Sequence, residues 1–242
     1  MKGFLSVLVL ILFISSYSYN LHPMMTKLKN SKKYSDVKTN TMTIIGTLLL
    51  NHNYEPAFVA GVLGNIYHEG SIGRFESSAY ISNPSAEPQY LKYMDQKYNY
   101  RSKYSGKCVT DVSLRELFQL LQTLKKDKWQ KGKFGLGCVQ WTGGRTYTLV
   151  ETYREVCNNC DRITLDQATA GEGNMIMKEL KGSHLYVYNN WKNQNSSNKN
   201  SSTAAYNAGY IVCKQYEVPA DIEKRAKERG NTSKNIYSIM TS

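Results

Sequence analysis

Proline, histidine and long hydrophobic runs are scarce in this sequence. The chain of 242 residues has only 5 Pro and an ordinary 41% of hydrophobic residues, a composition that excludes a disordered or fibrous protein. Its 4 His are far apart and indicate no metal centre, so we expect neither a metal ion nor a cofactor. At this length one main domain is expected.

The one marked hydrophobic run lies at the start of the chain. Lys2 precedes an apolar run from Phe4 to Ile14, and small polar residues follow up to Tyr19. The run has about eleven residues, whereas a bilayer needs roughly twenty, so we expect no integral membrane association. The pattern predicts a signal peptide over residues 1–19 and a secreted, extracellular protein. Residues 20–40 would then form an N-terminal extension.

Acidic residues are also few. The chain has 19 Asp plus Glu against 31 Lys plus Arg, which gives a formal net charge of +12. Such a charge attracts anionic polymers, and bacterial walls and nucleic acids are both anionic. The sequence has no recognisable nucleic-acid module, and a secretory signal argues against that partner. We therefore expect a monomer that binds an anionic wall glycan and does not bind nucleic acid.

The chain has five cysteines, an odd number. In an exported protein they predict two disulfides and one free thiol, with the pairing left open. The spacing of Cys157 and Cys160 fits half of a zinc site, but there is no second pair of this kind. Sequons at Asn195, Asn200 and Asn231 would accept glycans if the host glycosylates its secreted proteins.

Apolar residues recur mostly at helical spacing, and no convincing alternating strand is present. The pattern predicts helices over Thr41–Asn51, Glu55–Glu69, Leu114–Lys128, Arg145–Val156, Leu165–Leu180, Ser202–Tyr216 and Pro219–Arg229. The chain also has 19 Tyr, many of them in the stretch from Phe75 to Lys133. We predict a mainly α fold, with room for a small β-hairpin in this Tyr-rich stretch.

Glu69 is the first candidate for chemistry. It follows Val62 and Ile66 on the apolar stripe of the predicted helix and lies at the C-terminal end of that helix. Burial and the helix dipole both disfavour the charged form of a carboxylate at such a position. A carboxyl group that stays protonated near neutral pH can act as a general acid. The alternative is a Glu at a frayed helix end that turns to water.

Two further runs could bind a ligand. Gly135–Thr142 combines glycines with the amide of Gln140 and the flat ring of Trp141, which suits a polar ring-shaped ligand. In Ala204–Gly209, small neighbours leave Tyr206 and Asn207 room to reach a cleft. The alternatives are a tight turn with Trp141 in the core and a closely packed helix with Tyr206 at its edge. A fourth run, Tyr216–Ala220, indicates only a helix end followed by a helix that begins at proline.

These runs carry a resemblance to a known family. Val59–Glu69, Gly135–Thr142 and Tyr216–Pro219 resemble the motifs of the phage tail lysozyme family in the same order, over about Thr41 to Tyr237. Glu69, the glycine-rich run and the Ala204–Gly209 run also resemble the motif order of lytic transglycosylases and goose-type lysozymes. Both resemblances imply a lysozyme-like fold, with residues 41–238 as the catalytic domain.

The resemblance implies specific roles. Glu69 takes the place of the general acid, and Gln140 takes the place of the glutamine that lines the glycan cleft. Tyr206 and Asn207 match a Tyr-Asn pair near the acid. Trp141 is a further candidate for binding the sugar. The implied reaction cleaves the β-1,4 bond between N-acetylmuramic acid and N-acetylglucosamine of peptidoglycan. Attack by water would make the protein a lysozyme, and attack by the muramic 6-hydroxyl a lytic transglycosylase. A second carboxylate is not selected among Glu76, Glu87, Asp95 and Asp111.

The chain departs from these families at two positions and leaves two alternative functions open. Gly70 stands where these families usually have Ser, and Cys138 where an aliphatic residue is usual. The missing hydroxyl suggests, as one alternative, a catalytically inactive protein that binds peptidoglycan or a chitin-type glycan. The other alternative is a wall peptidase with Cys138 as nucleophile and His184 as base.

Overall fold

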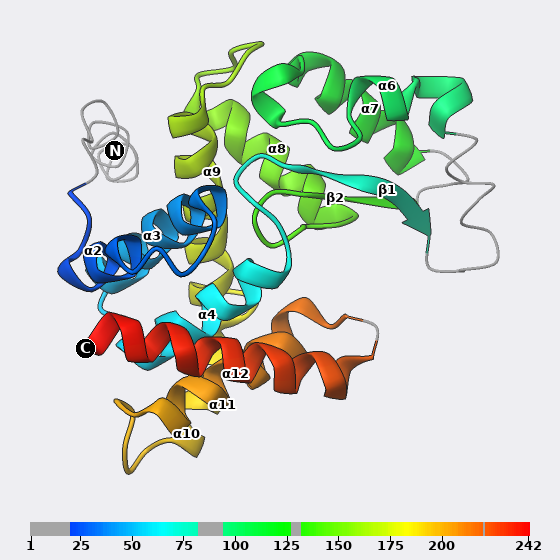
Figure 1. The fold of residues 1–242 in the computed structure, drawn as a ribbon. Coiled ribbons are helices and arrows are strands. Elements are labelled where there is room, and N and C mark those ends of the chain that lie inside the picture. The colour runs from blue at the N-terminus through cyan, green and yellow to red at the C-terminus, as the bar shows by residue number, and fades with distance from the viewer. Residues whose placement is uncertain (1–19, 82–93, 127–131, 220) are drawn as a thin grey trace, which may run out of the picture.

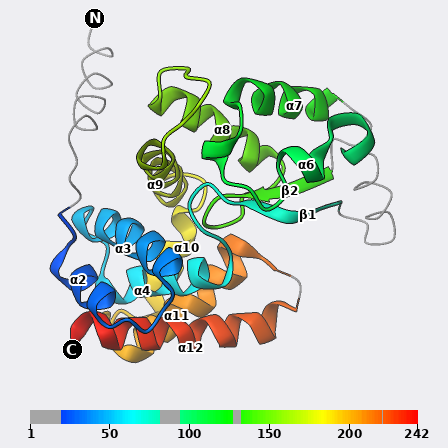
Figure 2. The ribbon, with the colours of Figure 1, turned by 45° about the horizontal axis from the view of Figure 1, so that its top comes forward.

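The computed structural model describes residues 20–81, 94–126, 132–219 and 221–242. The predicted signal peptide and Glu87 therefore lie outside the described residues. In Figures 1 and 2 the described chain forms two parts. One is a group of helices, and the other contains a small sheet with helices beside it. Nearly all regular structure is helical, so the predicted mainly α fold class is confirmed.

The helical part is built around α4. This helix spans Pro56–His68, and ten of its thirteen residues are buried, as expected for a helix that is apolar on nearly every side. The helices around it are α2 (Pro23–Asn30), α3 (Asp36–Asn51), α10 (Leu185–Gln194), α11 (Ser202–Val212) and α12 (Ile222–Thr241). Within the predicted N-terminal extension, α2 buries Met25 and Leu28 completely.

Small residues let α4, α11 and α12 approach closely. A Cβ atom on Gly61 of α4 would overlap Ala208 of α11, and one on Gly64 would overlap the Ser233 side chain of α12. A larger side chain at these positions would force the helices apart. The close packing fixes the C-terminal end of α4 relative to the other two helices.

The second part contains a two-stranded antiparallel sheet. Strand β1 (Phe75–Ile81) pairs with β2 (Gly132–Leu136), so that Phe75 lies opposite Leu136 and Ile81 opposite Gly132. A small antiparallel sheet is present where a β-hairpin was predicted, but it is not a hairpin, because its strands come from the two ends of the Tyr-rich stretch. Between them lie the short helices α6 (Tyr100–Lys103) and η2 (Val109–Asp111) and the longer α7 (Leu114–Lys126).

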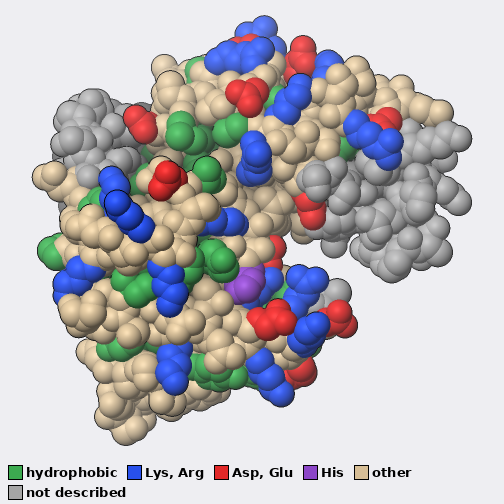
Figure 3. Space-filling view, viewed as in Figure 1, with side chains coloured by type: hydrophobic (Ala, Val, Ile, Leu, Met, Phe, Trp, Pro, Cys, Tyr) green, Lys and Arg blue, Asp and Glu red, His purple; other side chains and the backbone are tan. Residues whose placement is uncertain are grey.

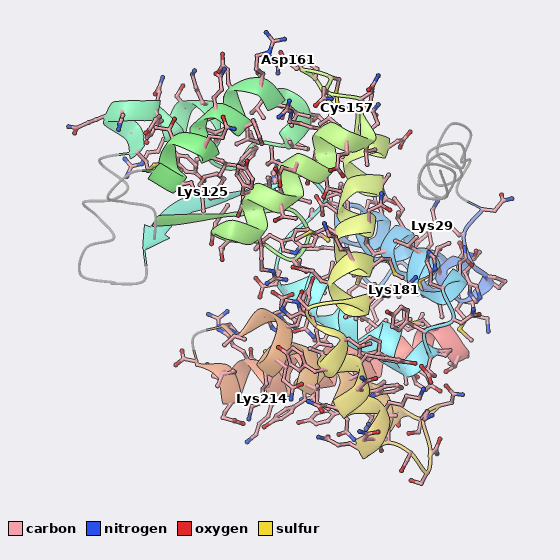
Figure 4. The ribbon with its side chains drawn as sticks, turned by 180° about the vertical axis from the view of Figure 1, so that it is seen from behind. Lys29, Lys125, Cys157, Asp161, Lys181 and Lys214 are labelled. Carbon is pink, nitrogen blue, oxygen red and sulfur yellow. A yellow bond between two sulfur atoms is a disulfide. The ribbon has the colours of Figure 1, made fainter. Side chains whose placement is uncertain are left out.

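Two helices connect the parts. Helix α8 (Gly144–Val156) packs on α7 and on α9 (Leu165–Lys181), and α9 also contacts α3 and α10. Figure 4 shows α9 running from the end of the molecule near Cys157 and Asp161 towards Lys181, beside the helical part. Its start is fixed by a capping box, in which Gln167 N donates to Thr164 Oγ1 (3.2 Å) and Thr164 N donates to Gln167 Oε1 (3.0 Å).

The expectation of two disulfides is wrong. Cys157 and Cys160 form a disulfide, while Cys108, Cys138 and Cys213 are free. The free sulfur atoms lie in different surroundings: that of Cys108 is near the Ile72 carbonyl, that of Cys138 faces Glu172, and Cys213 interacts electrostatically with Arg229. The structure thus contains one disulfide and three free thiols among the described residues.

Other boundaries also differ from the prediction. Helix α3 begins at Asp36 rather than Thr41, and α12 continues to Thr241, past Arg229. Helix α10 was not predicted, and the predicted helix to Tyr216 ends as a π-helical turn, η3 (Cys213–Glu217). Among the residues that the structure describes, no helix has both the length and the apolar character needed to cross a membrane.

Candidate active site

Glu69 is the residue directly after α4. Its backbone N–H donates to the carbonyls of Asn65 (3.1 Å) and Ile66 (3.2 Å), so the last helical turn fixes its main chain. Its side chain is 21% exposed, and its Oε1 accepts a hydrogen bond from the guanidinium of Arg229 on α12, which is only 2% exposed. Glu69 is thus neither a lone buried carboxyl group nor one turned freely to water, but half of an ion pair. Arg229 was not among the site residues predicted from the sequence.

Asn65 holds Arg229 in place. Its side chain is fully buried, and its Nδ2 donates to the carbonyls of Gly61 (2.9 Å) and Gly209 (3.0 Å). Its Oδ1 accepts from Arg229 Nη1 at 3.0 Å. The guanidinium that binds Glu69 is therefore oriented by contacts from α4, α11 and α12 together.

Lys38 of α3 binds the main chain on both sides of Glu69. Its Nζ donates to the carbonyl of Gly70 at 2.7 Å and lies 3.4 Å from that of Ile66. Burial lowers the pKa of Lys38, while Cys138 and Glu69 act in the opposite direction. This ammonium group is therefore part of the polar surroundings of the Glu69 backbone.

The glycine-rich loop, Gly135–Thr142, packs directly against Gly70, the residue after Glu69. Gly70 N donates to the Cys138 carbonyl (3.1 Å), and Gly137 N donates to the Arg74 carbonyl (2.9 Å). A Cβ atom on Gly70 would overlap the Gly137 carbonyl oxygen and lie 2.6 Å from Gln140 Nε2. Gly70 is thus explained by packing, because no side chain fits between the two loops.

Gln140 lies in this loop with its backbone in the left-handed region, at φ 50°. Its Nε2 donates to the carbonyls of Gly137 (2.8 Å) and Arg74 (3.1 Å). Its Oε1 is buried and has no hydrogen-bond partner among the described residues. Gly135 N donates to Glu76 Oε2 at 3.0 Å, and a Cβ atom on Gly135 would meet both Glu76 Oε2 and Gln140 Oε1. Gln140 and Glu76 therefore lie together at the start of the loop.

The other two carboxylates considered for a second catalytic role bind elsewhere. Asp95 pairs with Arg101 at 3.0 Å, and Asp111 accepts from Cys108 N at 3.2 Å. Of the described residues in that group, Glu76 is the one in contact with the glycine-rich loop.

Glu172 of α9 lies beneath this loop. It is fully buried, and it accepts hydrogen bonds from Gly73 N (2.5 Å), Cys138 N (2.7 Å) and Tyr153 OH (2.6 Å). Burial raises the pKa of Glu172, and these donors partly offset that effect. One carboxyl group thus holds both the chain after Glu69 and the glycine-rich loop.

The alternative Cys138–His184 pair is not formed. Cys138 is fully buried beside Glu172, and burial raises the pKa of its thiol well above the usual value. His184 instead contacts Ser183 Oγ (3.0 Å) and the ring of Tyr216, with ring centroids 4.9 Å apart. A thiol in these surroundings lacks the thiolate character of a nucleophile.

Trp141 occupies a core position. It is 0% exposed, and its indole N–H donates to Glu179 Oε2 at 3.0 Å. Glu179 also accepts from Arg145 Nε (2.7 Å) and Nη2 (2.9 Å) and from Tyr216 OH. In this structure the face of the Trp141 ring is not open to a sugar, which corresponds to the tight-turn alternative.

The side chains of the predicted Tyr-Asn pair contact groups other than Glu69. Asn207 Nδ2 donates to Asn195 Oδ1 at 2.9 Å, and Asn195 itself is only 6% exposed. The Tyr206 ring lies against Gly230 of α12 and stacks on Tyr210, with ring centroids 6.4 Å apart. Both side chains thus contribute to helix packing, as in the closely packed helix alternative.

Glu217 lies in the Tyr216–Pro219 motif, for which no chemical role was predicted from the sequence. It ends η3, and its Oε1 is buried with no hydrogen-bond partner among the described residues. Burial and, next, repulsion from Glu69 raise the pKa of Glu217 to about 8, against the pull of Arg145 and Arg229. A second carboxyl group therefore lies within electrostatic reach of Glu69.

The surface is hollowed near these groups. Figure 3 shows a hollow on the right of the molecule, between the part with the sheet and the part with α12, with charged side chains around its inner end. The C-terminal end of α4 lies at this place in the same view (Figure 1). Pairs of carboxyl groups beside a hollow fit acid–base chemistry on a polar polymer.

The comparisons with known proteins give one match. A family model described as Phage tail lysozyme matches residues 39–240, which covers most of the chain and the site just described. Nothing matches this chain among curated proteins or among solved structures. The family match agrees with the resemblance found in the sequence motifs.

Proposed function

Because this chain belongs to the phage tail lysozyme family, we propose that it is a secreted peptidoglycan hydrolase that cleaves the β-1,4 bond between N-acetylmuramic acid and N-acetylglucosamine, with Glu69 as general acid. The family implies a lysozyme-like enzyme and peptidoglycan as substrate.

The observation that carries the proposal is the placement of Glu69. A rigid helix end presents its carboxyl group, and Arg229, fixed by Asn65, holds one of its oxygens. In the proposed reaction Glu69 gives a proton to the leaving oxygen while the sugar gains oxocarbenium character. Arg229 stabilises the carboxylate that remains, and the attacking water returns a proton to the site. A general acid of this kind contributes roughly 100-fold or more to the rate.

The test compares soluble fragment release from purified peptidoglycan by the mature protein and by Glu69→Gln. The amide keeps the shape of the side chain but has no proton to donate, so we expect at least a roughly 100-fold lower rate. Glu155→Gln, an exposed position on α8, is the matched control and should retain the wild-type rate. Equal rates for the wild type and Glu69→Gln would refute the role of Glu69.

The glycan-binding alternative loses its main support in this structure. Gly70, the residue that suggested an inactive protein, is required by the close approach of Gly137 and Gln140. Binding of the wild type to peptidoglycan without any release of fragments would nevertheless favour that alternative over the proposal.

A further inference from the structure

The turn that carries Glu217 has an unusual arrangement of side chains. Glu217 ends a π-helical turn, and the next residue, Val218, has its backbone in the left-handed region at φ 49°. That conformation is strained for a β-branched residue. The turn leaves the apolar Val218 61% exposed and buries a carboxyl oxygen of Glu217, the reverse of what hydrophobicity favours. π-Helical turns and strained residues of this kind are frequent at functional sites.

The neighbouring charges leave Glu217 without a counter-ion of its own. Arg145 is held by both oxygens of Glu179, and Arg229 is held by Glu69 and Asn65. Each guanidinium is therefore already balanced by another carboxylate. An ionised Glu217 would be an additional, half-buried negative charge with one oxygen out of reach of solvent, which is costly, so the neutral form is favoured.

The other titratable groups near Glu217 do not alter this balance. Its electrostatic neighbours are Glu69, Glu179, Arg145, Arg229, Cys138, Cys213 and Tyr216. Burial raises the pKa of the Cys138 thiol and the Tyr216 phenol well above their usual values and that of Cys213 to about 11, so all three are neutral at pH 7. Burial and repulsion from Glu69 likewise raise the pKa of Glu217 to about 8.

We propose that Glu217 is a second functional carboxyl group of this site: it carries a proton at neutral pH and acts through Glu69 by supplying the proton that Glu69 passes to the leaving oxygen. This role rests on the function proposed above. Glu217 is a positioning residue in this scheme, because only Glu69 is assigned contact with the reacting atoms. Two carboxyl groups with proton affinities set apart by their surroundings are a common way to divide acid and base roles.

The proton balance of the step closes within the site and the attacking water. One proton moves from Glu217 to Glu69 and from Glu69 to the glycosidic oxygen, as the bond from that oxygen to the anomeric carbon breaks. Protonation of Glu69 releases Arg229, whose charge then offsets that of the ionised Glu217. The attacking water forms the new bond to the anomeric carbon and loses a proton, which returns to the carboxyl pair. No other reactant is needed.

The first test detects the proton itself and does not depend on activity. Infrared spectra of the folded protein across pH would follow the carbonyl band of a protonated carboxyl group. We expect a band at pH 7 that disappears as the pH rises, with a midpoint at about pH 8. This band should be absent in Glu217→Gln. It should be retained in the control Glu223→Gln, which removes an exposed carboxylate that pairs with Lys214. In Glu69→Gln the midpoint should fall, because a repelling charge is lost and Arg229 is freed. A carbonyl band at pH 7 that is the same in the wild type and in Glu217→Gln overturns the proposal, because the buried Glu172 can add a band of its own but only Glu217 is removed in this variant.

The second test measures the role of this proton in turnover. Glu217→Gln should lower kcat at least tenfold with little change in KM, and the alkaline decline of the wild-type rate near the Glu217 midpoint should vanish. Glu217→Asp, which keeps a protonatable group, should restore part of kcat and the alkaline decline. A role in folding alone would lower thermal stability and leave the shape of the pH profile unchanged, and that result contradicts the proposal.

The two tests separate this inference from the proposed function. If the wild type releases no fragments at any pH, the proposed function fails, and with it the role of Glu217 in turnover. The infrared result still decides whether Glu217 carries the proton. If the wild type is active and Glu217→Gln keeps both its rate and its pH profile, the inference alone is refuted.

Discussion

Arg229 determines how Glu69 is presented. Its guanidinium is almost fully buried, contacts Glu69 directly and is oriented by Asn65. The helical spacing predicted that Glu69 lies at the end of the apolar stripe of α4, and this placement is correct. The partner could not be predicted in the same way, because Arg229 is 160 residues away in the sequence, at the end of another predicted helix. Spacing within one helix reveals which face is buried, but not which residue from another helix meets it.

Gly70 provides a test at the same scale. Although the resembling families usually have Ser here, we predict that Gly70→Ser destabilises this protein by about 1–3 kcal/mol, because the added Cβ would collide with the Gly137 carbonyl oxygen. Chemical denaturation of the variant measures this loss. The control is Gly144→Ser, where an added Cβ meets no atom within 4 Å. Equal stability of Gly70→Ser and the wild type would show that the two loops are not packed as described.

At the scale of elements, local pattern predicted the longer helices better than the connections. The apolar periods of α4, α7 and α9 are strong within each segment, so their bounds fall close to the expected ones. The pairing of Phe75 with Leu136 joins residues far apart in the sequence, and a periodicity within one segment does not contain that information. Trp141 is a similar case, since only the tertiary contact with Glu179 shows that its ring is in the core.

The turn η3 also carries a prediction. Val218 is exposed and has φ 49°, so Val218→Gly removes strain while losing little buried surface. We expect this variant to be more stable than the wild type by about 1 kcal/mol. Val37→Gly, at an equally exposed Val in the first turn of α3, should instead lose about 0.3 kcal/mol. Thermal unfolding of both variants measures the difference, and destabilisation by Val218→Gly would contradict the strained turn.

For the whole molecule, Glu217 links stability to pH. Its pKa is raised from 4.5 to about 8 in the folded protein, so between these values the folded state holds a proton that the unfolded chain releases. The free energy of unfolding of the wild type, relative to Glu217→Gln, should therefore fall as pH rises from about 4.5 to about 8 and stay level outside that range. Urea unfolding of both proteins over this pH range measures the difference. A difference that does not vary with pH would mean that Glu217 is ionised in the folded state.

The two-part architecture and the basic charge together account for the proposed substrate. The site residues come from the end of α4, η3, α12 and the glycine-rich loop, and the end of α4 lies at the hollow between the two parts (Figures 1 and 3). A net charge of +12 favours approach to an anionic wall polymer at low ionic strength. Cleavage of the glycan within this polymer is the central claim.

The most direct test of that claim is mass spectrometry of the fragments that the mature protein releases from purified peptidoglycan. The account predicts muropeptides with a reducing N-acetylmuramic acid end from the wild type, and their loss in Glu69→Gln. Fragments with an anhydro-muramic end would contradict hydrolysis and assign the attack to the muramic 6-hydroxyl. Fragments with a reducing N-acetylglucosamine end, or cut only in the peptide, would contradict the proposed bond.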